Sequence, residues 1–231
     1  MSKIKYSALV SDARNKLNGS VLSKNRYGNY IRNKTTPVNP QTTFQQNARA
    51  ALAANSQAWG GLTEAQRNGW KALAQELPFT DIFGDSKTLA GNSLYNKLNG
   101  NLQKIGESPI DDAPVKEAVP AIVAEALTAS STGGVLSSLS LQFSPSPIPA
   151  GVCAVIYATP GISPGRSFVK NQFRLISFAN PAETSAKNIF ADYSYRFGTP
   201  ASGQKIFVRI VFVSIATGQQ GIPSEVMAVI S

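Results

Sequence analysis

Histidine is absent from the 231-residue chain, and cysteine occurs once, as Cys153. Without histidine, neither a Ser-His nor a Cys-His nucleophile pair can form. The ligand sets of ordinary zinc sites are lacking for the same reason, and one cysteine cannot make an internal disulfide. Walker, Rossmann and nucleophile-elbow motifs are missing as well. Carboxylate and Ser-Lys chemistry stay open, but the sequence favours a protein that is not an enzyme and needs no cofactor.

Charged residues are scarce, and long apolar runs are missing. Only 15% of the residues are charged, against roughly 25% in typical globular proteins, whereas 42% are hydrophobic. No apolar run approaches the ~18 residues that span a bilayer. The first residues, MSKIKYSALVSD, lack the apolar region of a signal peptide. We therefore expect a hydrophobic core, no membrane partner, and synthesis in a reducing cytosol.

The net charge of +9 belongs almost entirely to the N-terminal segment. Residues 1–50 hold nine Lys/Arg residues and one acid, Asp12, which gives +8. Such asymmetry predicts an interaction segment for an acidic protein surface or for nucleic acid, with a solvated tail as the alternative. Interleaved tyrosines suit both partners, as anchors on a protein or as stacking groups for bases. Because the charge is thin for a nucleic-acid arm and polar Asn, Gln and Thr residues follow it, we favour a protein partner.

Residues 1–41 are predicted to form a basic arm that contains a β-hairpin. The stretch GSVLSKNRYGNYIRNK, residues 19–34, alternates on both sides of Gly28, which suits a tight turn. An isolated hairpin is marginal in water, so a partner must hold it, for example through an exposed sheet edge. The residues expected to bind that partner are basic or apolar side chains of the arm and the first helix: Arg14, Lys16, Lys24, Arg26, Tyr27, Tyr30, Ile31, Arg32, Lys34 and Phe44.

Residues 42–106 are predicted to form a module of three short amphipathic helices. The first begins near Thr42 or Thr43 and ends at Gly60-Gly61. The sequence TEAQ at 63–66 is a capping box that opens the second helix. The third spans roughly 89–105. Each helix has an expected buried stripe: Phe44, Ala48, Leu52 and Trp59 in the first, Trp70, Leu73, Ala74 and Leu77 in the second, and Leu94, Leu98, Leu102 and Ile105 in the third.

The hydrophobic period changes to two after a proline-rich, acidic segment at 107–118, which we interpret as a linker. Seven short strands over about 110 residues are typical of an immunoglobulin-like or fibronectin type III sandwich. We therefore predict a multi-domain α+β protein with an arm, a helical module and an antiparallel β-sandwich at 119–231. The expected strands lie near 119–129, 136–144, 151–158, 168–178, 187–197, 205–216 and 224–230.

A few other residues invite a functional interpretation that the sequence does not favour. Asp81 and Asp85 are four apart, as in some metal sites, but Gly84 lies between them and turn formation is the simpler account. Cys153 sits in the apolar stretch GVCAVIY, which predicts a buried structural thiol. Trp59 and Trp70 are expected in the core of the helical module.

The sequence GSVLSKNRYGNYIRNKTTPVNPQT, Gly19 to Thr42, has a distinctive pattern of fixed positions. That pattern is G-S-V-x-S-x-N-R-x-G-x-Y-x-R-x-K-x-x-P-x-N-P-x-T, followed downstream by the capping-box segment GLTEAQRNGW. It resembles a family of virion proteins from Bacteroidota phages and prophages, of the crAss-like phage type. The resemblance covers about the first hundred residues, and beyond them it is one of architecture alone.

This resemblance implies a structural part of a phage particle, located in the virion. The nearest description is an auxiliary or decoration protein of the capsid, present in many symmetric copies. Its arm would bind the major capsid protein or other virion proteins, and an immunoglobulin-like domain would be displayed. A portal, neck or tail component is the alternative within this class. A basic packaging or cargo protein that binds nucleic acid is the alternative outside it.

Overall fold

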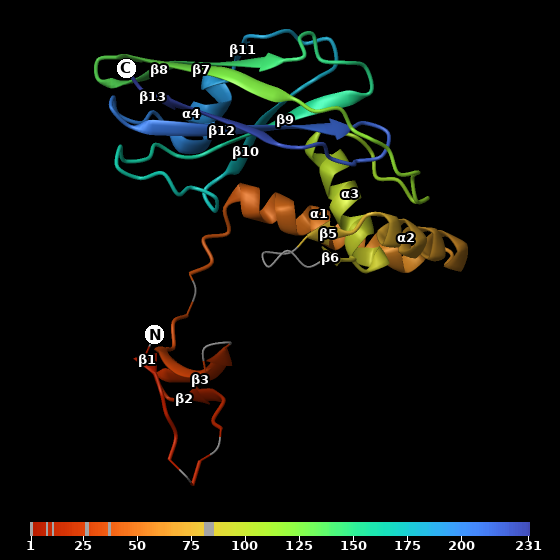
Figure 1. Cartoon of the computed structure of the whole chain (residues 1–231), viewed down its shortest axis with the longest axis vertical. Coiled ribbons are helices and arrows are strands. Elements are labelled where there is room, and N and C mark those ends of the chain that lie inside the picture. The colour runs from red at the N-terminus through yellow and green to blue at the C-terminus, as the bar shows by residue number, and fades with distance from the viewer. Residues whose placement is uncertain (1, 8, 11, 26–27, 37, 81–85) are drawn as a thin grey trace. The chain divides into compact units, whose positions relative to one another are not determined.

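The computed structural model describes residues 2–7, 9–10, 12–25, 28–36, 38–80 and 86–231 (Figure 1). The fold is mixed, with helices and antiparallel sheets, which confirms the predicted α+β class. The chain divides into two compact units, Met1–Gln46 and Asn47–Ser231. Among the described helices, none is both long and apolar enough to cross a membrane.

The N-terminal unit is a four-stranded antiparallel sheet. Its strands are β1 (Ser2–Lys3), β2 (Asn15–Leu17), β3 (Ser20–Asn25) and β4 (Gly28–Asn33), in the order β1-β4-β3-β2. The predicted hairpin is confirmed as β3 and β4, which pair from Ser20↔Asn33 to Asn25↔Gly28. Strands β1 and β2 flank it on both sides and were not expected, so the arm carries a small sheet.

This sheet has no core of its own. Every described residue from 4 to 46 whose side-chain environment is known is either half-buried or exposed. The half-buried positions include Val21, Leu22, Tyr30 and Ile31 in the two central strands, and Ile4, Tyr6 and Ala13 outside them. A sheet usually needs one face packed against other structure for independent stability. The N-terminal unit therefore exposes two faces that its own described residues do not cover.

Three predicted helices are confirmed as α1 (Thr43–Gly61), α2 (Glu64–Glu76) and α3 (Gly91–Lys104). The capping box at the start of α2 is present, because Thr63 and Gln66 bond reciprocally. Between α2 and α3 lie the short strands β5 (Phe79–Thr80) and β6 (Ser86–Lys87). The shared core contains these buried side chains: Leu62, Trp70, Leu73, Ala74, Leu94, Tyr95 and Leu98.

Helix α1 departs from the expected packing. Its predicted buried stripe is largely exposed, since Phe44 and Leu52 expose 42% and 57% of their surface and Ala48 is exposed too. Only Trp59, near its end, packs against the helical core, where its ring lies 5.5 Å from the ring of Tyr95. The helical spacing of apolar residues in α1 is confirmed, but most of that face is exposed.

The C-terminal region forms two antiparallel sheets around one apolar core (Figure 1). One sheet has the order β11-β8-β7 and the other β10-β9-β12-β13. The predicted period of two is visible in the core, where alternate side chains such as Leu141 and Val208 are fully buried. The strands are β7 (Val123–Thr132), β8 (Val135–Ser144), β9 (Val152–Ala158), β10 (Arg174–Ala179), β11 (Lys187–Asn188), β12 (Lys205–Ser214) and β13 (Ser224–Val229).

The strand expected at 187–197 is wrong for most of its length. Only Lys187–Asn188 is a strand, and Phe190–Phe197 forms helix α4. The aromatic residues Phe190, Tyr193 and Phe197 recur at three and four residues, which places them on one helical face. Tyr193 is fully buried beneath that face, with its ring 5.2 Å from that of Phe197. The helical spacing of large apolar side chains therefore outweighed their ordinary preference for strands.

The segment at 107–118, predicted as a linker, is hydrogen-bonded to the elements on both sides of it. Asn99 exchanges two hydrogen bonds with the backbone of Ile110, at 2.8 and 3.1 Å. The indole of Trp70 donates to the carbonyl of Asp111 at 2.8 Å. On the sandwich side, Gln219 donates to the carbonyl of Val115, also at 2.8 Å. The segment thus connects helices and sheets through bonds to both.

Helix α3 packs directly on the outer face of the four-stranded sheet (Figure 1). Asn101 of α3 also donates a hydrogen bond to the carbonyl of Gly218, in the loop after β12, at 2.9 Å. Helices and sandwich therefore belong to one compact unit. The apolar contact joins Leu102 and Ile105 to Cys153, Val155, Val211 and Val213.

Gly218 gives a direct test of this joint. It has a left-handed backbone (φ 69°), and a Cβ there would lie 2.4 Å from the carbonyl oxygen of Leu98 in α3. Gly151 has a similar backbone (φ 84°) with nothing within 4 Å of the added Cβ. Both Ala substitutions should cost about 1–2 kcal/mol for the backbone, and Gly218→Ala about 1–3 kcal/mol more for the overlap.

Chemical denaturation of the two variants measures this difference. A single transition, with Gly218→Ala clearly less stable than Gly151→Ala, is the expected result. Equal losses would show that α3 does not need its close approach to the loop after β12.

Candidate partner-binding face of the N-terminal sheet

The strand register sorts the predicted binding residues onto two faces of the N-terminal sheet. Lys16 of β2 lies opposite Val21 of β3, and Val21 lies opposite Arg32 of β4. These three residues form one row on one face, because side chains of directly paired residues share a face. Two residues along the strands, Ser23 and Tyr30 form the next row on the same face. We call this the basic face.

A hollow of about 340 Å³ lies on the basic face, lined by Lys16, Val21, Arg32, Lys34, Thr35 and Thr36. Lys34 follows directly after β4 and is held beside the β2–β3 turn, where its amide donates to the carbonyl of Gly19 at 2.7 Å. The lining thus combines three cations, one apolar side chain and two hydroxyls, and it contains no carboxylate. Such a group of donors suits a carboxylate or a phosphate.

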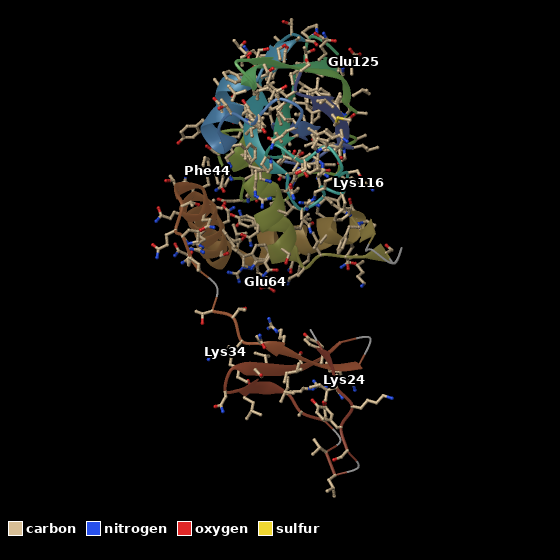
Figure 2. The ribbon with its side chains drawn as sticks, turned by 90° about the vertical axis from the view of Figure 1, so that its left-hand side faces the viewer. Lys24, Lys34, Phe44, Glu64, Lys116 and Glu125 are labelled. Carbon is tan, nitrogen blue, oxygen red and sulfur yellow. The ribbon has the colours of Figure 1, made fainter. Side chains whose placement is uncertain are left out.

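The opposite face has a different character. Leu22 lies opposite Ile31, and both are half-buried, while Leu17 of β2 is 64% exposed. Lys24, opposite Asn29, belongs to this face as well. Lys24 and Lys34 lie toward different ends of the sheet (Figure 2). Two of the predicted binding residues, Ile31 and Lys24, are therefore separated from the hollow by the thickness of the sheet.

The remaining predicted residues are not part of the hollow. Arg14 forms an exposed ion pair with Asp12, with Nε to Oδ2 at 2.9 Å. Phe44 lies in the first turn of α1, where 42% of its surface is exposed. Arg26 and Tyr27 lie outside the described residues. Of the ten residues, the structure brings together Lys16, Arg32 and Lys34, with Tyr30 in the neighbouring row.

Three lining residues, Val21, Thr35 and Thr36, were not among the predicted binding residues. The signal for their surroundings was present, because Asn18-Gly19 between β2 and β3 is a common two-residue hairpin connection. Asn18 adopts the left-handed backbone (φ 49°) that such loops require. Recognising this turn would have predicted β2, and with it the row that joins Lys16, Val21 and Arg32.

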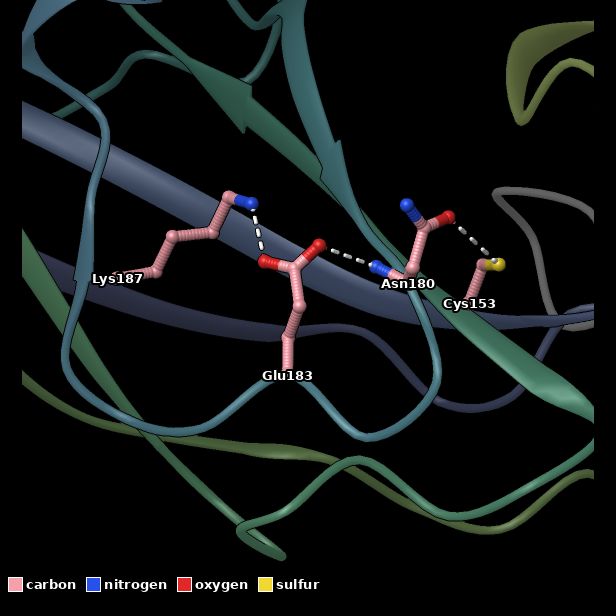
Figure 3. Close-up of polar contacts among 4 residues, drawn as sticks. All are labelled: Cys153, Asn180, Glu183 and Lys187. Carbon is pink, nitrogen blue, oxygen red and sulfur yellow. Dashed lines mark hydrogen bonds and ion pairs between the residues drawn. The ribbon is translucent and has the colours of Figure 1, made fainter.

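The other sequence candidates have structural roles or fall outside the described residues. Cys153 is buried, as predicted, and its thiol donates to Asn180 Oδ1 at 3.9 Å (Figure 3). Burial, together with the carboxylates of Glu107 and Glu183, raises the pKa of this thiol, which disfavours the reactive thiolate. Trp70 is fully buried in the helical core, as expected. Asp81 and Asp85 lie outside the described residues.

Glu183 anchors the polar cluster next to Cys153. Its carboxylate accepts a hydrogen bond from the amide of Asn180 at 2.8 Å and forms an ion pair with Lys187 (Figure 3). Burial alone would raise the pKa of Glu183. The hydrogen bonds from Lys187 and Asn180 and the charge of Lys187 outweigh it, so the pKa lies below the ordinary 4.5. The ionised form therefore stabilises the loop between β10 and β11.

This lowered pKa predicts an acid-dependent loss of stability. A carboxylate with a depressed folded-state pKa contributes stability above its unfolded pKa and loses it as pH falls through the folded value. Glu183→Gln should therefore lower stability at neutral pH, and the difference from the original protein should shrink as pH falls below 4.5. Denaturation curves across this range measure it, with the exposed Glu125→Gln as control. A Glu183→Gln deficit independent of pH would refute the role of its charge.

The candidate site of this protein is thus a basic face that carries the hollow. Among the described residues, no three or more Cys, Asp or Glu side chains gather in a way that could hold a metal ion. The hollow offers donors for an anion, while Tyr30 and Val21 offer aromatic and apolar contact area beside them. Compared with models of protein families, with curated proteins and with solved structures, the chain has no match in any of the three.

Proposed function

We propose that this protein is a structural component of a phage virion, most nearly an auxiliary or decoration protein of the capsid. Its N-terminal sheet would anchor the chain, and the remainder would be displayed. The observation that carries this proposal is the uncovered N-terminal sheet. Residues 1–46 contain eight Lys/Arg residues and one acid, yet none of the sheet residues whose side-chain environment is known is buried.

Energetics support an external partner for this sheet. Ordering the backbone costs on the order of 1 kcal/mol or more per residue. Apolar burial normally offsets that cost, at about 25 cal/mol for each Å² removed from water. Val21, Leu22, Tyr30 and Ile31 are only half-buried, so further burial of these side chains against a partner is still available. A partner surface that covers these side chains would therefore stabilise the sheet, and the same burial would contribute to the affinity between the sheet and the partner.

The sequence resemblance supports a virion as the place where that partner is found. Gly19–Thr42 carries the pattern shared with phage virion proteins, and it contains β3, β4 and the chain that leads to α1. Val21, Arg32 and Lys34 stand at fixed positions of that pattern, and all three line the hollow. The part of the chain that resembles virion proteins is thus also the part with a basic binding face.

The C-terminal sheets support a displayed immunoglobulin-like domain. If β7, β8, β9, β10, β11, β12 and β13 are lettered A, B, C, C′, E, F and G, the sheets are A-B-E and C′-C-F-G. We propose that this order reflects a fibronectin type III-like sandwich, an architecture shared by many cell-surface domains. Helix α4 lies in the sequence between strands E and F, and it is an addition to that plan.

Purified particles test the proposal. Particles released by bacteria that carry the gene for this chain would be purified and their proteins identified by mass spectrometry after chemical cross-linking. The proposal predicts the chain in the particles, with cross-links from Lys16 or Lys34 to a shell protein. Particle imaging would then separate a capsid position from a portal, neck or tail position. Particles that lack the chain would contradict the proposal.

The anchor itself is tested by a paired substitution. Tyr30→Ala with Arg32→Ala removes the aromatic and guanidinium groups of two neighbouring rows on the basic face. Truncating such anchors commonly costs about 2 kcal/mol or more, which corresponds to roughly 30-fold weaker binding. Incorporation into particles should fall accordingly when the variants are expressed at matched levels.

The control removes two exposed lysines from the other unit, Lys97→Ala with Lys170→Ala. Lys97 belongs to α3 and Lys170 to the loop before β10, both in the unit Asn47–Ser231. The control should be incorporated like the original protein. If both double variants are incorporated equally well, the N-terminal sheet is not the anchor.

A further inference from the structure

We infer that the hollow on the basic face binds a carboxylate presented by an acidic segment of a partner protein. The inference rests on the proposed anchoring role of the N-terminal sheet and names the chemistry of its contact. Lys16 and Arg32 lie on either side of Val21, in strands β2 and β4. Adjacent strands are about 4.8 Å apart, so the two outer backbones are separated by roughly 10 Å. Their long side chains can both reach a group placed above Val21.

The charge of this hollow is not neutralised within its own unit. Asp12 is the single acidic residue of positions 1–46, and it pairs with Arg14 at 2.9 Å. Lys16, Arg32 and Lys34 form no ion pair with any described residue. Three cations that share one hollow repel one another, and an entering anion would relieve that repulsion. The hydroxyls of Thr35 and Thr36 add neutral donors at the rim.

The arrangement fits an acidic protein segment better than nucleic acid. Arg32 offers a planar fork that binds a carboxylate through two parallel hydrogen bonds. Val21, and Tyr30 in the next row, offer area for the aliphatic part of a peptide. A nucleic-acid backbone would need a longer track of cations, but Lys24 lies on the opposite face and Arg14 is paired with Asp12. Contact at this face is therefore local.

Two sources could supply the carboxylate, an Asp or Glu side chain or the C-terminus of a chain. Both present two carboxylate oxygens to the same donors. An acidic peptide with an amidated C-terminus contains the first group, and a neutral peptide with a free C-terminus contains the second. Comparing the two peptides assigns the source.

The test measures binding of the full-length protein to fluorescent probes by anisotropy. The probes are a short Glu/Ser peptide with an amidated end, a Ser/Gly peptide with a free end, and a single-stranded oligonucleotide with the charge of the acidic peptide. The acidic peptide should bind more tightly than the oligonucleotide at the same salt. Arg32→Gln and Lys16→Gln should each weaken its binding by about tenfold, the effect of losing a hydrogen bond between charged groups.

Lys24→Gln is the matched control, because it removes one positive charge from the same sheet but on the opposite face. It should change affinity by about twofold at most, as expected for an exposed charge that makes no direct contact. Equal weakening by all three substitutions would overturn the inference, since it would indicate diffuse attraction to the unit's net charge. Tighter binding of the oligonucleotide would overturn it as well, in favour of nucleic acid.

These outcomes are separate from those of the proposed function. A chain found in virions that binds neither peptide would end the carboxylate inference and leave the anchor standing. A chain that binds the acidic peptide through Arg32 and Lys16 but is missing from particles would end the proposed virion role and leave the carboxylate inference standing. Binding of the free-ended neutral peptide alone would assign the hollow to a chain terminus.

Discussion

A β-sheet is stable when at least one of its faces is removed from water, and the N-terminal sheet of this protein meets that condition only in part. Its central strands pair over their full length, which satisfies their backbone groups along one side. Its side chains are half-buried at best within the described residues. The weak burial of this sheet and its positive net charge have one cause. Polar and basic residues occupy positions where a core would need apolar ones. A partner that covers one face is the physical complement of this arrangement.

The rest of the chain contrasts with this sheet. Its two C-terminal sheets enclose a continuous apolar core, and α3 extends that burial to the outer face of β9 and β12. The bonds of Asn99, Asn101 and Gln219 fix the segment at 107–118 and the loop after β12 to the helices. A rigid body of this kind can carry its own stability. On our proposal, the chain combines this unit with an N-terminal sheet that a partner in an assembly would hold.

Local signals made much of the fold predictable from the sequence. The capping box at Thr63, the Gly60-Gly61 stop and the alternation around Leu141 and Val208 each depend on neighbours in the chain, and each was confirmed. Long-range features were not predictable in this way. The docking of 107–118 depends on Asn99 and Gln219, which lie far away in sequence. The hollow depends on the register of β2, which pairs residues on either side of the Asn18-Gly19 turn. Helix α4 was not predicted because its aromatic residues ordinarily prefer strands.

The central claim is that the N-terminal sheet is only marginally stable alone and is held by a partner in an assembly. Hydrogen exchange of the backbone amides of β3 and β4 tests it most directly, in the free full-length protein and in purified particles. The account predicts exchange in the free protein that is far faster than for β9 and β12 of the buried core, and strong protection of the same β3 and β4 amides in the particle. Protection of β3 and β4 in the free protein equal to that of β9 and β12 would contradict it.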